Sequence, residues 1–232
     1  MKNNTIIKTA ASMILVVCLV MGTGFNTYAS STIDDVESDN STTAINEIIQ
    51  NFEENISLNE NGFYEVELTA VREDFADMNP ADLNEAFRQT GMNSTNEIVS
   101  TFMSGVESVN SQIADGDLVF IDNENLNDAE DDNYYLQGGS TYDITHWWGR
   151  SRYKSTYYAN KWANDLNKCA AANAGAAVVA GWVFGGVGAV PNGTVSAYCW
   201  YLASDVSYYN SLSSRGIVAD ITWVYAYKMR TQ

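Results

Sequence analysis

The chain is poor in histidine, cysteine, proline and positive charge. Its 232 residues include one His, three Cys, two Pro and 12 Lys plus Arg, against 29 Asp plus Glu. Acid–base or nucleophilic catalysis needs a positioned base, and His146 is the one imidazole available. A net charge of −17 disfavours nucleic acid, since phosphate contacts require many cations. We therefore expect that the protein is not an enzyme and binds no cofactor, metal ion or nucleic acid. A catalytic pair of His146 with an unbridged cysteine thiol remains an alternative.

The first 29 residues are typical of a secretory signal peptide. Lys2 and Lys8 make the first residues positively charged, residues 10–20 are apolar, and residues 27–29 (Thr-Tyr-Ala) form a cleavage site that ends in a small residue. The apolar run is shorter than the roughly 20 residues of a membrane span, which disfavours an uncleaved anchor. We expect residues 1–29 to be removed, residues 30–40 to be disordered, and the protein to be secreted and extracellular.

Two cysteines, Cys169 and Cys199, remain after signal removal, in a compartment where disulfides persist. We predict one bridge between them, with two free buried thiols as the alternative. In one straight helix over residues 156–190, the two Cα atoms could not approach to the roughly 7 Å that a bridge needs. The bridge therefore requires a broken helix, at residues 173–175 or at the glycines of residues 185–188.

Charge divides the mature chain into two parts. Residues 30–143 contain 26 acidic and two basic residues, a net charge of −24, whereas residues 144–232 contain eight basic and three acidic residues, a net charge of +5. All six tryptophans lie in the second part. Such asymmetry favours two modules with different partners.

Residues 41–122 predict an acidic, mostly helical (α+β) module. Apolar residues recur at helical spacing over residues 44–56, Asn79-Pro80 and Gly91 bracket a helix, and Ser94 with Glu97 forms a capping box for a helix ending at Gly116. Short strands are expected at residues 63–68 and 117–122. Residues 123–140 have few large apolar groups and predict an acidic, disordered linker.

Residues 141–232 predict a cationic, Trp-rich module. Period-two alternation over residues 142–148 and 217–230 indicates two strands, which we expect to pair and close the module. A helix capped by Ser155 or Thr156 and a second helix after residues 191–193 lie between them. Residues 169–190 join these helices and carry no charge; we call them the uncharged stretch. The fold class is thus α+β, a small acidic module plus an Ala/Gly-rich helical hairpin closed by two terminal strands.

The uncharged stretch has two interpretations. Its length suits a bilayer core, and Gly181 with Gly185 forms a GxxxG element for close helix contact. Its glycines would cost about 5 kcal/mol of helix stability in water. A buried hairpin in a soluble domain is equally compatible with the sequence.

This layout of a signal peptide, an acidic pro-region and a cationic Ala/Gly-rich module with two cysteines resembles secreted bacteriocin-like antibacterial precursors of Gram-positive bacteria, including the sporulation-delaying toxin type. The resemblance covers roughly residues 144–232 and implies insertion in a target-cell membrane. It would place aromatic rings at the lipid interface and cations on anionic lipid. The aromatic residues are Trp147, Trp148, Trp162, Trp182, Phe184, Trp200 and Trp223, and the cations are Arg150, Arg152, Lys154, Lys161 and Lys168.

The acidic part would then restrain this toxin until release, and an immunity protein would protect the producing cell. The alternative is a soluble, secreted, non-enzymatic binding protein. Gly138-Gly139 marks the boundary where charge and tryptophan content change, and we expect an extracellular protease to cut between residues 131 and 140.

Overall fold

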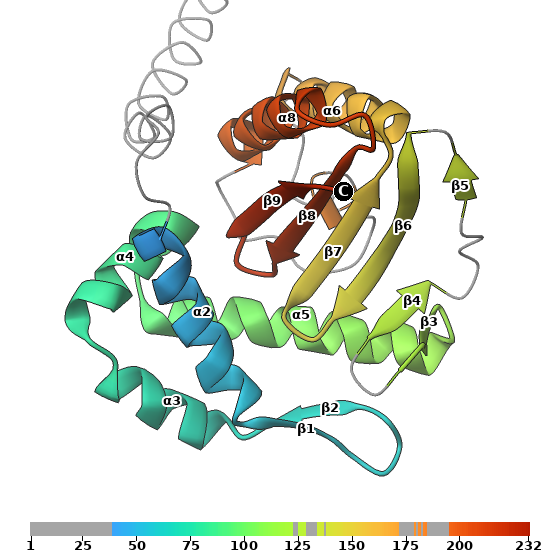
Figure 1. Ribbon diagram of the computed structural model, residues 1–232. Helices are drawn as coiled ribbons and strands as arrows, with labels where there is room; N and C mark the ends of the chain where they lie inside the picture. Colours follow the sequence, from blue (N-terminus) through green and yellow to red (C-terminus); the bar gives the residue numbers. More distant parts are fainter. Residues whose placement is uncertain are drawn as a thin grey trace, which may run out of the picture. The chain divides into compact units, whose positions relative to one another are not determined.

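The computed structural model describes residues 39–122, 125–128, 134–136, 138–171, 179, 181, 183–184 and 195–232 (Figure 1). The signal peptide and most of the uncharged stretch, with both predicted helix breaks, lie outside these residues. The fold is α+β, as predicted, with helices and antiparallel sheets.

The acidic part begins with α2 (Asp39–Glu53), the hairpin β1 (Ile56–Leu58) and β2 (Tyr64–Val66), and α3 (Leu68–Asp77). It continues with α4 (Pro80–Thr90), α5 (Thr95–Asp115) and β3 (Leu118–Phe120). The predicted caps are confirmed. The Asn79 side chain accepts a hydrogen bond from the Ala81 N–H, Ser94 accepts from the Glu97 N–H, and Gly91 and Gly116 end α4 and α5 in the left-handed conformation.

The predicted linker contains strands. β4 (Leu126–Asp128) and β5 (Tyr134–Leu136) lie within residues 123–140, and β6 (Gly139–His146) begins there. β4 pairs with β3 on one side and, at Leu126 opposite Thr145, with β6 on the other. Leu126 is fully buried, so an apolar side chain helps to anchor this segment to the core.

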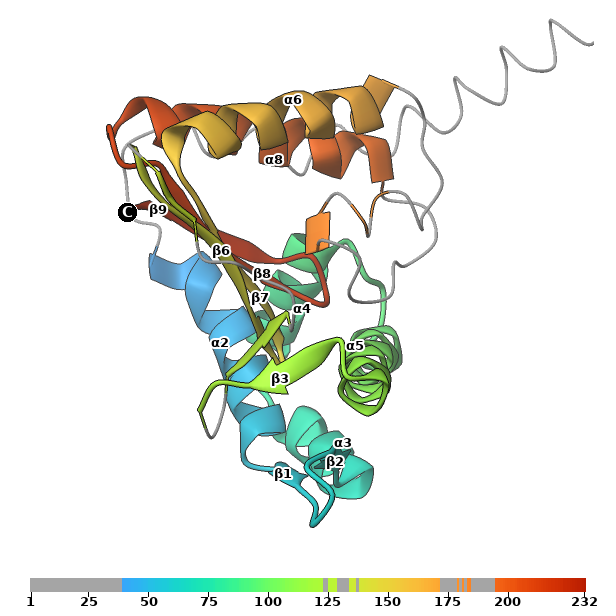
Figure 2. The ribbon, with the colours of Figure 1, turned by 90° about the vertical axis from the view of Figure 1, so that its right-hand side faces the viewer.

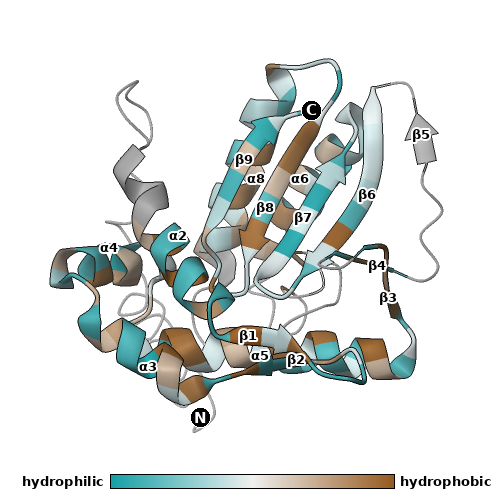
Figure 3. Cartoon of the chain, turned by 60° about the horizontal axis from the view of Figure 1, so that its bottom comes forward, coloured by the Kyte–Doolittle hydropathy of each residue, from teal (hydrophilic) through white to brown (hydrophobic). Residues whose placement is uncertain are grey.

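The C-terminal part adds β7 (Gly149–Lys154), α6 (Thr156–Ala171), α8 (Val195–Ser211), β8 (Ile217–Thr222) and β9 (Tyr227–Thr231). The larger sheet has seven strands in the order β3-β4-β6-β7-β8-β9, with β5 beside β6. Figure 3 shows apolar residues concentrated on β8 and polar residues on β7 and β9 to either side.

Two expectations for this sheet need correction. The single strand predicted over residues 217–230 is a hairpin, because the chain turns at residues 223–226, where Tyr225 has a φ of 68°. The two predicted terminal strands do not pair directly, because β7 lies between β6 and β8.

Helices α6 and α8 pack against each other over one face of the sheet (Figures 1 and 2). They run antiparallel: the Asn210 side chain donates to the Thr156 carbonyl at one end, and Cys199 lies beside Cys169 at the other. The buried residues of α6, such as Trp162 and Leu166, face the interior of the protein.

The core continues from the acidic part into the C-terminal part. Trp147, in the turn after β6, lies 6.2 Å from Phe52 of α2 and 6.4 Å from Phe102 of α5, measured between ring centroids. Trp223, after β8, packs over Gly105 of α5, where a Cβ atom would lie 2.3 Å from the indole ring. Residues 38–232 accordingly form one compact unit, instead of separating at residues 123–140.

The double glycine opens β6 with positive φ angles of 103° at Gly138 and 101° at Gly139. A Cβ atom on Gly139 would lie 1.6 Å from the carbonyl oxygen of Arg215, so the two backbones are in direct contact. Next to it, the Gln232 side chain donates to the Ser140 carbonyl and accepts from the Ser140 N–H. Gly138-Gly139 is therefore packed into the end of the sheet where β6 begins.

Candidate functional site

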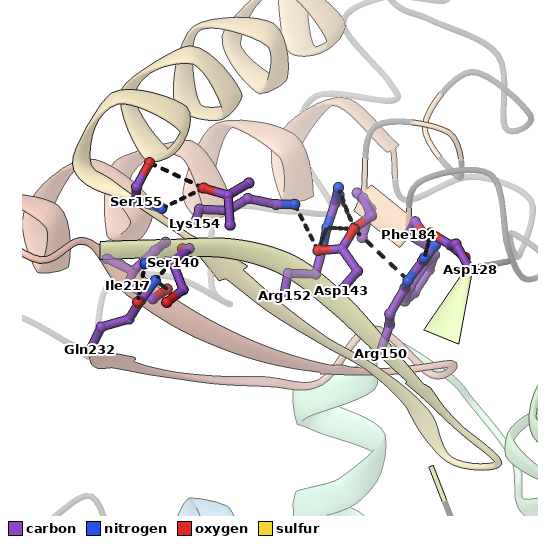
Figure 4. Close-up of polar contacts among 12 residues, drawn as sticks. Asp128, Ser140, Asp143, Arg150, Arg152, Lys154, Ser155, Phe184, Ile217 and Gln232 are labelled. Carbon is purple, nitrogen blue, oxygen red and sulfur yellow. Dashed lines mark hydrogen bonds and ion pairs between the residues drawn. The ribbon is translucent and has the colours of Figure 1, made fainter. Parts of the chain in front are cut away.

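Three cations on β7 converge on one carboxylate of β6 (Figure 4). Because alternate residues of a strand share a face, Arg150, Arg152 and Lys154 point to the same side. Asp143 lies opposite Arg152 in the β6–β7 register. Its carboxylate is 3.1 Å from an Arg152 nitrogen, 2.7 Å from Lys154 Nζ and 3.9 Å from Arg150 Nε. We call these four residues the Asp143 cluster.

Burial and mutual attraction set the charges in this cluster. Burial alone would raise the pKa of Asp143, but Arg152, Lys154 and Arg150 outweigh it and hold that pKa well below its usual range. Burial, aided by the neighbouring Arg152, lowers the pKa of Lys154 to about 8, against the opposing effect of Asp143. The cluster is thus ionised at neutral pH.

The two arginines also bind two described residues within the uncharged stretch. Arg150 Nη1 donates to the Phe184 carbonyl at 2.5 Å, and Arg152 Nη1 donates to the Val183 carbonyl at 2.7 Å (Figure 4). The Phe184 ring is fully buried, with its centroid 5.2 Å from Trp223 and 5.4 Å from Tyr225. These contacts hold Val183 and Phe184 inside the protein.

Arg150 links the same cluster to the acidic part. Its Nη2 lies 2.5 Å from the Asp128 carboxylate of β4. Asp143 was not among our candidates, yet the alternation of Arg150, Arg152 and Lys154 along the chain is a strand signal that could have revealed it. A buried strand bearing three cations requires an acidic neighbour.

The structure places three of the five predicted lipid-binding cations inside the protein. Arg150 is 1% exposed and Arg152 is buried, with its guanidinium 4.8 Å from the centre of the Trp162 ring. Lys154 is nearly as enclosed. These three side chains therefore cannot contact lipid in this conformation, because Asp143 and main-chain carbonyls already bind them. Lys161 and Lys168 are exposed on α6.

The predicted membrane-contacting aromatic residues divide in a similar way. Trp147, Trp162, Trp223 and Phe184 are buried in the core, and Trp148 is partly buried and stacks on His146, with ring centroids 4.5 Å apart. Trp200 is 56% exposed. Trp182 lies outside the described residues. The hydrophobicity of these residues did not distinguish the protein core from a membrane-contacting surface, because tryptophan is favoured in both.

Among the described residues, nothing packs against Gly181 where the sequence predicted a helix contact. A Cβ atom there would meet none of their atoms within 4 Å, and the residue is exposed. Gly185, the second glycine of the element, lies outside the described residues.

The two cysteines are adjacent but not bonded. Their sulfur atoms are 3.4 Å apart, beyond the roughly 2.05 Å of a disulfide, and both thiols are free and buried. The predicted bridge is therefore corrected to a thiol pair between α6 and α8. Burial, with the neighbouring Cys169, raises the pKa of Cys199, which makes it a poor nucleophile at neutral pH.

His146 lies in a hydrogen-bonded row on the other face of the sheet. Its Nε2 is 3.0 Å from Ser151 Oγ, and that hydroxyl donates to Asp220 at 2.7 Å. Burial lowers the pKa of His146 to about 4, although Asp220 and Asp122 oppose the shift. Because the serine stands between the imidazole and the carboxylate, Asp220 does not orient His146 as a catalytic triad requires.

The outward surface of α6 and α8 combines aromatic rings with lysines. Tyr157, Lys161 and Lys168 are exposed at helical spacing on α6, and Trp200 and Tyr208 on α8. We call these five residues the outer face.

Comparison with models of protein families, with curated proteins and with solved structures finds no match. Within the described ranges, no helix has both the length and the apolar character to cross a membrane. The same part of the chain contains no group of three or more His, Cys, Asp or Glu residues suited to a metal ion.

Proposed function

We propose that the protein is a secreted, bacteriocin-like antibacterial protein that acts on the membrane of a target cell. The observation that carries this proposal is the binding of Val183 and Phe184, within the uncharged stretch, to Arg150 and Arg152. A 22-residue segment without charge is tethered between two helices that are themselves partly exposed and aromatic. Release of this segment would supply an apolar element able to enter lipid.

The acidic part would restrain the C-terminal part through contacts. Phe52 and Phe102 cover Trp147, α5 covers Trp223, and Asp128 binds Arg150. These local contacts act in addition to the general electrostatic attraction between residues 30–143, with a net charge of −24, and residues 144–232, with a net charge of +5. An extracellular protease cutting near residues 131–140 would weaken the restraint, and the producing cell would need an immunity protein.

A second candidate function is a soluble, secreted, non-enzymatic binding protein. The burial of Trp147, Trp162 and Trp223 favours it, since these side chains already serve a water-soluble core.

Dye release from vesicles discriminates between the two functions. The mature chain, residues 30–232, is added to vesicles of phosphatidylglycerol and phosphatidylethanolamine and to vesicles of phosphatidylcholine. We expect release from the anionic vesicles, together with depolarisation of Gram-positive indicator cells. Intact vesicles and unaffected cells at micromolar protein, before and after proteolysis at the 131–140 segment, would leave the binding protein as the better account.

A further inference from the structure

The outer face exposes three large aromatic side chains to solvent. Its aromatic members are 66% (Tyr157), 56% (Trp200) and 59% (Tyr208) exposed, and Leu212 just beyond α8 is 57% exposed. The other three large apolar side chains exposed among the described residues are Leu58, Val119 and Ile121, in the acidic part. Exposed aromatic area is thus concentrated on one helical pair.

Helices α6 and α8 together carry two lysines and two aspartates, and of these four residues only the lysines are exposed. Lys161 and Lys168 project outward, whereas Asp165 is buried and pairs with Lys168 at 2.9 Å. Asp205 is the one charged residue of α8, and it accepts a hydrogen bond from the Tyr227 hydroxyl at 2.5 Å. The layer therefore presents lysines within a protein whose net charge is −17.

Aromatic rings beside lysines, on helices lying parallel to a surface, match the chemistry of an anionic lipid interface. Tyr and Trp place an apolar ring in the acyl boundary and a polar group among the headgroups, while lysines attract anionic phosphates. An anionic membrane would repel the acidic part, where 26 acidic residues stand against two basic ones, and so would not take up the apolar residues exposed there.

We propose that the outer face is the surface by which the folded protein docks on an anionic phospholipid bilayer. This inference rests on the proposed membrane activity and specifies its first step. Trp200 and Lys168 lie at the helix ends from which the uncharged stretch departs, as the adjacency of Cys169 and Cys199 shows. Docking through this face would bring the ends of that stretch to the bilayer before it is released.

Co-sedimentation with vesicles tests the docking face. Trp200→Ser and Lys161→Gln are each compared with a matched control, Ile121→Ser for a side chain 55% exposed and Arg72→Gln for an exposed cation. Partition to vesicles containing phosphatidylglycerol should fall about tenfold for Trp200→Ser and about fivefold for Lys161→Gln. The two controls should bind as the wild type does, and thermal denaturation should be unchanged in all four variants.

Brominated lipid provides a second readout. In a Trp182→Phe background, which removes the tryptophan of the uncharged stretch, it should quench tryptophan fluorescence, and this quenching should largely disappear when Trp200→Phe is added. Equal binding by all variants, or quenching that persists in the double variant, would overturn the docking face.

The outcomes separate this inference from the proposed function. Wild type that binds through Trp200 but releases no dye would support the docking face and contradict permeabilisation. Dye release that is insensitive to Trp200 and Lys161 would contradict the docking face while the proposed function stands. A wild type that neither binds nor releases dye would contradict both.

Discussion

Asp143 balances three cations in a region with little water. Each guanidinium or ammonium group would be costly to bury alone, and the strand register places a single carboxylate within reach of all three. The same arginines use their remaining N–H groups on the carbonyls of Val183 and Phe184. One aspartate therefore governs both the stability of the sheet and the binding of the uncharged stretch.

Replacing this carboxylate should destabilise the protein strongly. Asp143→Asn keeps the shape but removes the carboxylate that three buried cations share, so we expect the free energy of unfolding in urea to fall by about 3 to 5 kcal/mol. The control Asp77→Asn, at an exposed carboxylate, should change it by less than about 0.5 kcal/mol. A loss for Asp143→Asn no larger than that of the control would contradict the role given to the cluster.

His146 should make stability depend on pH. Burial lowers its pKa in the folded state to about 4, against an ordinary value of about 6.5, so between these pH values the unfolded chain takes up a proton that the folded chain does not. The contribution is complete above pH 6.5 and is lost as the pH falls towards 4, by up to about 3 kcal/mol. His146→Gln should flatten this part of the profile in urea unfolding measured from pH 7.5 to 4. Identical slopes for variant and wild type would show that His146 is not held neutral by the fold.

At the scale of elements, the contact of Trp223 with α5 depends on the absence of a side chain. A Cβ atom on Gly105 would lie 2.3 to 2.8 Å from three atoms of the indole ring, which is closer than real side chains approach. Helix α5 thus carries a glycine in its interior, at a cost in helix propensity of about 1 kcal/mol, in order to admit the tryptophan.

The same substitution at two glycines should have opposite effects. Gly105→Ala should lower the free energy of unfolding by about 1 to 3 kcal/mol, because the added methyl group overpacks the contact with Trp223. Gly181→Ala, at a helical position with open space around it, should be neutral or stabilise by up to about 1 kcal/mol. Thermal denaturation of the two variants checks this, and equal destabilisation of both would refute it.

Local signals predicted helices α2, α4, α5, α6 and α8, but they missed α3 and strands β1, β4, β5 and β7, and long-range pairing did not follow from them. The caps at Asn79, Ser94 and Gly116 are short-range hydrogen bonds, so the sequence contains all the information needed to place α4 and α5. The turn at Tyr225 escaped prediction because a tyrosine rarely adopts a positive φ. Strand β7 was missed because its charged residues suggested a surface, whereas their partners lie in β6 and in the uncharged stretch.

At the scale of the whole molecule, the division by charge is not a division of the core. Residues 38–128 contribute strands β3 and β4 to the larger sheet and the rings that cover Trp147. The composition indicates that one part of the chain is acidic and the other cationic. It could not show that the two parts share a core, because that core depends on individual apolar residues such as Leu126 and Phe102.

The C-terminal part should therefore not fold alone. Residues 139–232 would expose Trp147 and Trp223, so we expect weak near-ultraviolet circular dichroism and red-shifted tryptophan emission. Adding residues 38–128 as a separate chain should restore both signals, because those residues supply α2, α5, β3 and β4. A native-like spectrum of residues 139–232 in isolation would refute the shared core.

The close contact between Gly139 and Arg215 also bears on where a protease can cut the chain. Proteases accept their substrates as extended chains, yet Gly138 and Gly139 have positive φ angles and lie against the backbone that enters β8. The folded protein should therefore resist cleavage at the Gly138–Gly139 bond itself. An extracellular protease acting within residues 131–140, as proposed above, would cut the chain before the double glycine.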